Sequence, residues 1–312
     1  MSPVSRSAHS AEARPPALTA RLREIGPRWH LGIRAASEET KALYEPLLEA
    51  ACAAPDGVQV TRDIAYGSHP RQTLDVYRPA GARGAPVVVF VHGGAFVRGA
   101  KDATVQMWGN VLRWFARRGC VGINVEYRLA GEAPYPGGAQ DVALACDWVA
   151  RHAGAHGGDP RRVCLVGHSA GGTHAAAYAC DPLLGLAPKA HALVLVSARL
   201  RADVRRDNPN AAGVRAYHGE NEGRLALLSP VAHAARLQLP VLVVNAEYEN
   251  PWLDVYGLEF AHAVGQARGR APLHIALPDH NHISVVAHFN SGESWLGEQV
   301  LAFFEQACAR GG

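Results

Sequence analysis

Five short apolar runs, rich in β-branched residues, limit what this chain can fold into. Each run is continuous and does not alternate with polar positions, and the five span residues 87–91, 121–125, 163–166, 192–196 and 241–245. A strand that is apolar at every position must be covered on both faces, as parallel strands packed between helices are. The runs therefore predict a parallel sheet buried inside an α/β fold.

The segments between these runs have helical patterns, near residues 104–118, 138–154, 170–180, 252–267 and 293–309. Strands that alternate with helices build a doubly wound sheet. Two earlier segments, 58–64 and 73–77, alternate apolar and polar residues around the turn cluster at 67–70, which predicts an antiparallel hairpin at the edge of the sheet.

The chain divides into an N-terminal extension, residues 1–56, and one large domain, residues 57–312. The extension starts with about eighteen polar, Pro- and Ala-rich residues that we expect to be mobile. A helical pattern follows from Ser37 to about Ala53, and Pro46 is expected to break or kink it. Residues 198–238 are long for a connection and carry six arginines between Arg199 and Arg224, so they form either a lid over a site or a solvated insertion.

Composition excludes several classes of protein. The net charge is only +3, whereas nucleic-acid binding needs a concentrated excess of Lys and Arg. Six cysteines show no CxxC pair, which argues against a zinc site or a disulfide framework, and Cys120, Cys146 and Cys164 lie in apolar runs, which indicates reduced core residues. The N-terminus lacks the apolar stretch of a secretory signal, and no run of about eighteen apolar residues occurs, so we expect a cytoplasmic protein with no membrane span. A transit peptide is the alternative, because such peptides also start with Arg- and Ser-rich segments.

A candidate nucleophile follows the run at 163–166. Residues 167–171 read Gly-His-Ser-Ala-Gly, which matches G-x-S-x-G, and an Ala-rich helical segment follows directly. A serine on such a sharp strand-to-helix turn projects its hydroxyl above the sheet at a helix N-terminus. The context favours Ser169 as a nucleophile over a serine that merely happens to lie in a glycine-rich turn.

The residues after the run at 87–91 read His92-Gly93-Gly94-Ala95-Phe96. Consecutive glycines let backbone amides come close to a bound oxygen, and with the amide of Ala170 they could stabilise a tetrahedral oxyanion. We therefore expect an oxyanion hole formed by Gly93, Gly94 and Ala170, with His92 in a structural role.

Three signatures together resemble those of the α/β-hydrolase superfamily, and within it the carboxylesterase-like group of esterases similar to hormone-sensitive lipase. They are HGGAF at 92–96, GHSAGG at 167–172, and a Tyr-Arg-Leu-Ala-Gly-Glu loop that starts at Tyr127, ahead of Asp141, and carries Gly131 where proline is common. The resemblance covers about residues 58–309. We expect Asp141 itself to be a helix N-terminal charge or a structural ion-pair partner.

The resemblance implies the other two members of a catalytic triad. Chain order in this fold is nucleophile, acid, histidine. The family pattern places the histidine at His282, with His280 as the alternative; Asp279, His280 and His282 also allow a metal-site interpretation. The acid falls at Glu249, where aspartate is commoner, with Glu247 and Asp254 as competitors.

These expectations describe a serine hydrolase that cleaves carboxylic esters through an acyl-enzyme intermediate. No nucleotide-binding motif occurs, so no cofactor and no metal are expected. The expected partner is a small-molecule ester, and the sequence leaves a homo-oligomer open. Three alternatives remain: an amide or formamide hydrolase similar to arylformamidases, a thioesterase or lactonase, and a non-catalytic small-molecule-binding homologue.

Overall fold

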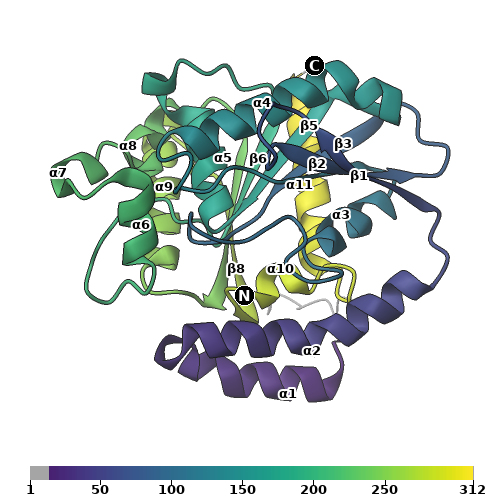
Figure 1. Ribbon diagram of the computed structural model, residues 1–312, viewed down its shortest axis with the longest axis horizontal. Coiled ribbons are helices and arrows are strands. Elements are labelled where there is room, and N and C mark those ends of the chain that lie inside the picture. The colour runs from purple at the N-terminus through teal and green to yellow at the C-terminus, as the bar shows by residue number, and fades with distance from the viewer. Residues whose placement is uncertain (1–13, 312) are drawn as a thin grey trace, which may run out of the picture.

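One eight-stranded sheet forms the centre of the molecule (Figure 1). The computed structural model describes residues 14–311. The sheet order is β1-β2-β4-β3-β5-β6-β7-β8. The strands are β1 Val58–Ala65, β2 Thr73–Pro79, β3 Ala85–Val91, β4 Val121–Val125, β5 Gly158–His168, β6 Ala192–Val196, β7 Val241–Tyr248 and β8 Leu273–Asn281.

The sheet is parallel from β4 through β8, and β1 and β2 extend it in antiparallel fashion. All five apolar runs lie in parallel strands, and the two alternating segments form the edge pair. The prediction of an α/β fold with a doubly wound, mostly parallel sheet and an antiparallel N-terminal hairpin is therefore confirmed.

Helices cover both faces of this sheet and are joined by short 3₁₀ turns. The helices are α1 Pro16–Ile25, α2 Ile33–Ala53, α3 Gly109–Ala116, α4 Gly137–His152, α5 Ala170–Cys180, α6 Ala211–His218, α7 Glu222–Leu225, α8 Pro230–His233, α9 Leu253–Arg268, α10 Ser284–Ala287 and α11 Trp295–Gly311. The 3₁₀ turns are η1 Gly26–Leu31, η2 Ala153–His156, η3 Pro182–Leu184 and η4 Ala234–Arg236.

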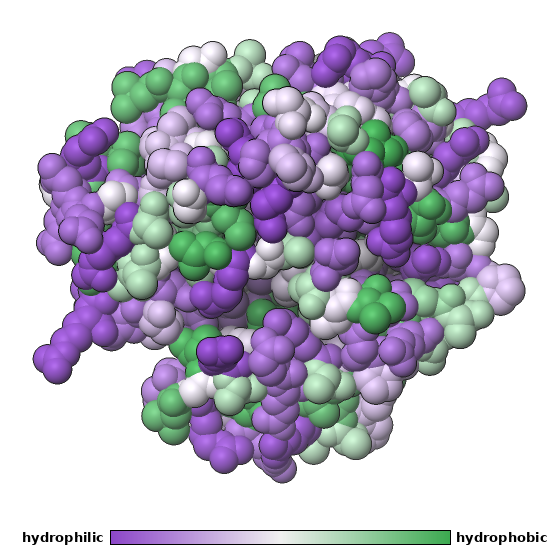
Figure 2. All heavy atoms as spheres, viewed as in Figure 1, coloured by the Kyte–Doolittle hydropathy of each residue, from purple (hydrophilic) through white to green (hydrophobic). Residues whose placement is uncertain are grey.

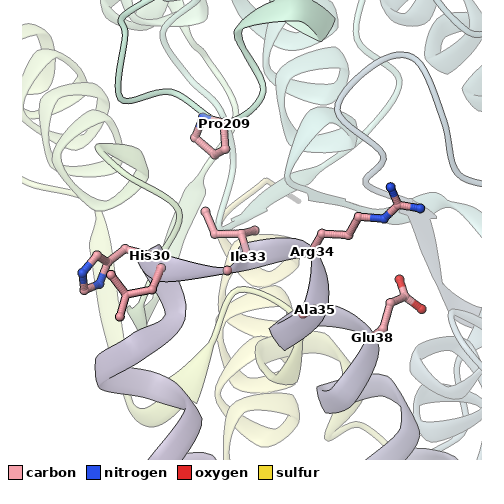
Figure 3. A pocket seen from close by; sticks show the side chains of 8 residues that line it. His30, Ile33, Arg34, Ala35, Glu38 and Pro209 are labelled. Atoms are coloured by element: carbon pink, nitrogen blue, oxygen red, sulfur yellow. The ribbon is translucent and has the colours of Figure 1, made fainter.

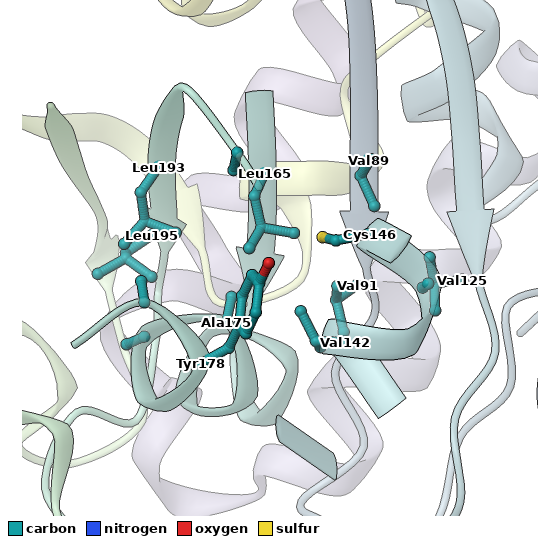
Figure 4. Close-up of a cluster of buried hydrophobic side chains, with 14 of the residues drawn as sticks. Val89, Val91, Val125, Val142, Cys146, Leu165, Ala175, Tyr178, Leu193 and Leu195 are labelled. Carbon is teal, nitrogen blue, oxygen red and sulfur yellow. The ribbon is translucent and has the colours of Figure 1, made fainter. Parts of the chain in front are cut away.

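The two faces of the sheet hold separate apolar cores, which is why the parallel strands are apolar at most positions. Val89 and Val91 of β3 face α4 and α5, where Val142 and Tyr178 pack against the sheet (Figure 4). The intervening Phe90 points to the opposite face, into the core shared with the N-terminal helices and α11. Side chains of a strand alternate between faces, so both sets need apolar partners.

The N-terminal extension is more ordered in structure than the sequence indicates. Residues 16–18 belong to α1, which we had not predicted, while the expected mobility of residues 1–13 lies outside the described part of the chain. Helix α2 starts at Ile33 and continues through Pro46, so the expected break there is wrong. Tyr44 and Leu48, both fully buried, anchor the helix on either side of the proline.

Other predicted boundaries shift by a few residues. The helix predicted at 104–118 is confined to α3, because residues 101–108 form an irregular loop. Residues 198–238 contain the three short helices α6, α7 and α8. None of the helices within residues 14–311 combines the length and apolarity that a membrane crossing requires.

Candidate active site

Ser169 occupies a strained turn between β5 and α5. Its backbone has φ 54° and ψ −119°, a region that non-glycine residues rarely adopt. The neighbouring glycines make the turn feasible, because a Cβ atom on Gly171 would lie 2.2 Å from the carbonyl oxygen of Val91. A Cβ atom on Gly172 would lie 2.4 Å from the Cβ atom of Ala198. The turn therefore holds the serine hydroxyl at the carboxyl edge of the sheet.

His282 and Glu249 line up behind this serine. The Nε2 atom of His282 lies 3.0 Å from Ser169 Oγ, and its Nδ1 atom lies 2.8 Å from Glu249 Oε2. A carboxylate can only accept, so Nδ1 carries the proton and Nε2 is left to accept one from the serine. Glu249 Oε1 accepts from the amide of Ala246 at 2.9 Å and from the hydroxyl of Ser197, which fixes the carboxylate.

The competing candidates lie elsewhere. Glu247 is exposed and accepts the amide of Asp279, and Asp254 is an exposed residue in the first turn of α9. His280 is buried and contacts Ser284, 3.1 Å from its Nδ1, so it does not face Ser169. Asp279 forms an ion pair with Arg23, and the described residues contain no cluster of three side chains suited to a metal.

The loop that carries His282 is braced from two sides. Asn281 accepts two backbone amides of the following turn through its side-chain oxygen, and its Nδ2 donates to Thr40 Oγ1 of α2 at 3.0 Å. On the other side, His168 Nε2 donates to the carbonyl oxygen of His282 at 2.9 Å. Burial lowers the pKa of His168 well below its usual value, so this ring stays neutral beside the histidine that must accept a proton.

The two glycines expected in the oxyanion hole lie directly beside the nucleophile. A Cβ atom on Gly93 would be 2.9 Å from Ser169 Cβ, so only glycine allows the backbone so close. Gly94 has φ 157°, and a Cβ atom there would lie 1.8 Å from the carbonyl oxygen of Arg98. Ala170 is the first residue of α5, so its amide has no partner within the helix and points out of the helix N-terminus.

The oxyanion loop, residues 92–101, is held by the buried carboxylate of Glu126. Glu126 accepts from the amides of Lys101 at 2.8 Å and Tyr127 at 3.1 Å, and also from Arg71. The ring of His92 lies with Nε2 3.2 Å from the same carboxylate and Nδ1 2.7 Å from the carbonyl oxygen of the next residue. Burial alone would raise the pKa of Glu126, but His92 and Arg71 outweigh it and lower that pKa.

Asp141 takes part in an ion pair and hydrogen bonds away from Ser169. It is buried in α4, four residues after the helix begins, and it forms an ion pair with Arg128 at 2.7 Å. It also accepts from Gln72 at 2.7 Å. Of the two roles expected for it, the ion-pair partner is the one that the structure shows.

A cavity of about 730 Å³ opens above Ser169. Its walls come from the oxyanion loop, the His282 loop, the start of α2 and two residues of the segment 198–238, Pro209 and Asn210. None of the arginines of that segment lines this cavity. A shallower groove continues from it past Ile33, Arg34 and Pro209 to His30 (Figure 3). Figure 2 shows this face as mostly hydrophilic and hollowed above α1 and α2.

The sequence analysis missed the contribution of the N-terminal helices to this cavity. Ile33, Arg34 and Ser37 of α2 line it, as does Asn250 next to the candidate acid. No motif marks these positions, because the recognisable signatures start only after residue 57. The alternation of Pro, Gly and apolar residues near 26–33 was the one local signal available, and it does not indicate a site.

Comparisons with known proteins find similar sequences and similar structures. The BD-FAE family model matches residues 74–182. A probable isoprenylcysteine alpha-carbonyl methylesterase of Arabidopsis thaliana is 36% identical over 149 residues, which is 47% of this chain and 34% of that protein. The matched segment therefore spans about a third of the length of this curated relative.

Solved structures match almost the whole chain. Esterase B of Lactobacillus rhamnosis, in an inhibited form, superimposes with a TM-score of 0.71 at 21% identity, covering 94% of this chain and 97% of that one. Brefeldin A esterase, described as a bacterial homologue of human hormone-sensitive lipase, gives a TM-score of 0.69 at 22% identity, over 95% and 93%. The chain thus has the same fold as these esterases, the α/β-hydrolase fold.

Proposed function

We propose that this protein is a serine hydrolase that cleaves carboxylic esters through an acyl-enzyme intermediate. The observation that carries the proposal is the continuous hydrogen-bonded chain from Ser169 Oγ through His282 to Glu249, with both distances at or below 3.0 Å. A nucleophile, a base and a group that orients the base form the arrangement needed for nucleophilic catalysis. The relatives named above carry the word esterase or methylesterase in their names, which supports the same reaction type.

In the first half of the reaction, Ser169 Oγ attacks the ester carbonyl carbon while His282 Nε2 takes its proton. The carbonyl oxygen becomes negative, and the amides of Gly93, Gly94 and Ala170 stabilise it. The tetrahedral intermediate collapses when the bond to the alcohol oxygen breaks and the imidazolium of His282 returns the proton to that oxygen. The acyl group is then bonded to Ser169.

In the second half, His282 removes a proton from water, which attacks the acyl carbon. A second tetrahedral intermediate forms in the same oxyanion hole, and its collapse frees the carboxylic acid and restores Ser169. Each oxyanion donor of this type contributes about 3 kcal/mol to the barrier reduction. Every group that these steps use belongs to the chain, so the mechanism calls for no cofactor.

A cytoplasmic location belongs to the same proposal. All six cysteines are free, and four of them are buried. Disulfides form and persist in oxidising compartments, so unpaired buried cysteines support a reducing one. The proposed partner is a small-molecule ester, and size-exclusion chromatography with light scattering would decide between a monomer and a homo-oligomer.

The test is hydrolysis of a series of p-nitrophenyl esters, from acetate to palmitate, by the wild-type protein and the Ser169→Ala variant. Ser68→Ala, at an exposed position in the β1–β2 turn, is the matched control. We expect turnover in the wild type and the control and its loss in Ser169→Ala. An absence of turnover on every ester, with folded protein, would refute the esterase; faster cleavage of matched amides than of esters would support an amide or formamide hydrolase instead.

A further inference from the structure

Asn250 lies in the wall of the cavity, directly after the candidate acid Glu249. Its side chain is buried, with 3% of the residue exposed, and it lines the cavity together with Ser169 and His282. The mechanism above gives it no role. A buried polar side chain in a substrate cavity needs a hydrogen-bond partner, because an unsatisfied one costs free energy.

The orientation of this amide is fixed by Trp29 of η1. Trp29 Nε1 donates to Asn250 Oδ1 at 2.9 Å, and both side chains are buried. An indole nitrogen can only donate, so the Asn250 atom that faces Trp29 must be the amide oxygen Oδ1. The amide nitrogen Nδ2 is then the atom that points away from Trp29. Among the described residues no acceptor is bonded to Nδ2. Asn250 thus offers the cavity two N–H donors in a preset direction.

The position of Asn250 indicates which half of an ester it meets. His282 must protonate the leaving alcohol, so the alcohol lies on the His282 side of the scissile bond. Asn250 follows Glu249, and Ile283 follows His282, and both line the cavity. This wall, completed by Ile33 and Arg34 of α2, therefore faces the alcohol part of the substrate.

On the wall of the cavity that faces the alcohol part, one cationic side chain has no anionic partner. Lys41 and Glu38 form an ion pair at 2.9 Å. Across the cavity, Arg98 of the oxyanion loop donates a hydrogen bond to Asn210 at 3.3 Å, and Asp102 follows that loop. Arg34 lines the cavity and forms no ion pair with any residue in the described range. It projects from the start of α2 beside the groove that leads outward (Figure 3).

We propose that the substrate is an ester whose alcohol part carries a second acceptor oxygen, which Asn250 Nδ2 binds and which Arg34 favours further when that oxygen is anionic. The inference rests on the proposed function, since it assigns the alcohol side from the role of His282. Asn250 is then a specificity-determining residue, and Trp29 positions it. The N-terminal extension takes part in substrate selection through Trp29 and Arg34.

Three butyrate esters of matched length test this idea: butyl, methoxyethyl and carboxyethyl butyrate. The second replaces a methylene of the first by a neutral acceptor oxygen, and the third ends in a carboxylate. Acid release is followed in a pH-stat, and each kcat/KM is divided by the rate constant of the same ester for alkaline hydrolysis, which removes intrinsic reactivity. We expect the methoxyethyl ester to exceed the butyl ester by about 3- to 10-fold, as one neutral hydrogen bond provides.

The carboxyethyl ester should gain about a further 3-fold from Arg34, which is exposed, and should lose that gain at high salt. Asn250→Leu should bring the methoxyethyl-to-butyl ratio close to one. Trp29→Phe keeps an aromatic side chain but removes the N–H that orients the Asn250 amide, and should lower the ratio. Arg34→Gln should remove only the carboxyethyl advantage. Arg206→Gln makes the same charge change on an exposed residue outside the cavity and should alter no ratio.

The outcomes separate the two proposals. If none of the three esters is hydrolysed by folded wild-type protein, the proposed esterase function fails. If all are hydrolysed and the butyl ester is equal or better after normalisation, the esterase stands and this inference is overturned. A methoxyethyl preference that survives in Asn250→Leu also overturns it. Should Asn250→Leu not fold, the wild-type ratios, their salt dependence and the exposed Arg34→Gln variant still decide.

Discussion

The assignment of Glu249 as the triad acid can be tested with one isosteric substitution. In Glu249→Gln the side chain keeps its length but loses its charge, and its amide nitrogen or oxygen must face His282 Nδ1 across 2.8 Å. Ser197 and the amide of Ala246 both donate to Oε1, so the glutamine oxygen is drawn to that side. The glutamine NH₂ group then faces Nδ1, which favours the wrong tautomer of the imidazole.

The wrong tautomer places the proton on Nε2, which can no longer accept one from Ser169. A change of this kind in a serine-histidine-acid triad lowers kcat by ~10⁴-fold, which corresponds to about 5 kcal/mol in the barrier. The two rival carboxylates provide matched controls. Glu247→Gln and Asp254→Asn change exposed side chains that do not touch His282, and both should retain the wild-type rate.

The assay is the steady-state hydrolysis of p-nitrophenyl butyrate over a range of substrate concentrations, which gives KM and kcat separately, and the melting temperature is recorded for each variant. We expect Glu249→Gln to lose kcat with little change in KM, since the substrate does not contact the carboxylate. A Glu249→Gln variant that is folded and active within about tenfold of the wild type would refute the assignment, as would a comparable loss in Glu247→Gln.

Three further predictions follow from the same structure. Gly94→Ala should lower kcat by about 10²-fold or more, because its Cβ atom would displace the carbonyl of Arg98 and with it the oxyanion loop; steady-state kinetics on the folded variant checks this. Thr40→Val removes the acceptor of Asn281 Nδ2 while keeping the side-chain shape, and should lower the free energy of unfolding by about 1 kcal/mol and kcat several-fold. Thr61→Val, at an exposed position of β1, is the control and should change neither quantity. Urea unfolding measures the first quantity and steady-state kinetics the second. Burial lowers the pKa of His218 to about 4, whereas the same side chain in the unfolded protein has its ordinary pKa near 6.5. Below about pH 6.5 the unfolded chain therefore binds a proton that the folded protein does not. The free energy of unfolding should be highest above that pH and lower by about 1.4 kcal/mol at about pH 5.5. His218→Phe should flatten that part of the fall, and urea midpoints at the two pH values would show no difference between variant and wild type if the reasoning is wrong.

The sheet was predictable because parallel strands covered by helices on both faces must be largely apolar, and this sequence contains five runs of that kind. The turn at Ser169 was predictable for a similar reason, since a strained strand-to-helix turn needs glycines at fixed positions. Both features are local: the residues that cause them are neighbours in the sequence. The role of Ser169, His282 and Glu249 remains a prediction, for which the structure supplies distances.

The features that escaped the sequence analysis depend on contacts between distant segments. Trp29 and Asn250 are 221 positions apart, and nothing in either neighbourhood indicates that they meet. Pro46 was expected to break a helix, yet the packing of Tyr44 and Leu48 outweighs the loss of one backbone hydrogen bond. Propensity is a weak guide wherever tertiary burial is strong.

The arginines of residues 198–238 give the same lesson about charge. In the sequence they accompany the choice between a lid and a solvated insertion, and in the structure Arg199, Arg201 and Arg205 form ion pairs with Asp203, Glu259 and Asp207. None of them lines the cavity above Ser169. Two arginines do line it, Arg34 of the N-terminal extension and Arg98 of the oxyanion loop, and both lie outside residues 198–238.

The central claim is that Ser169 forms a covalent bond with the substrate acyl group. Its most direct test is to treat the protein with one equivalent of a p-nitrophenyl alkylphosphonate, which a serine nucleophile attacks and retains, and to locate the adduct by mass spectrometry of the digested protein. We predict a single adduct on the peptide that contains Ser169, with p-nitrophenol released in equal amount and esterase activity lost in proportion. Release without an adduct, or an adduct on another residue of an otherwise inactivated enzyme, would contradict the account.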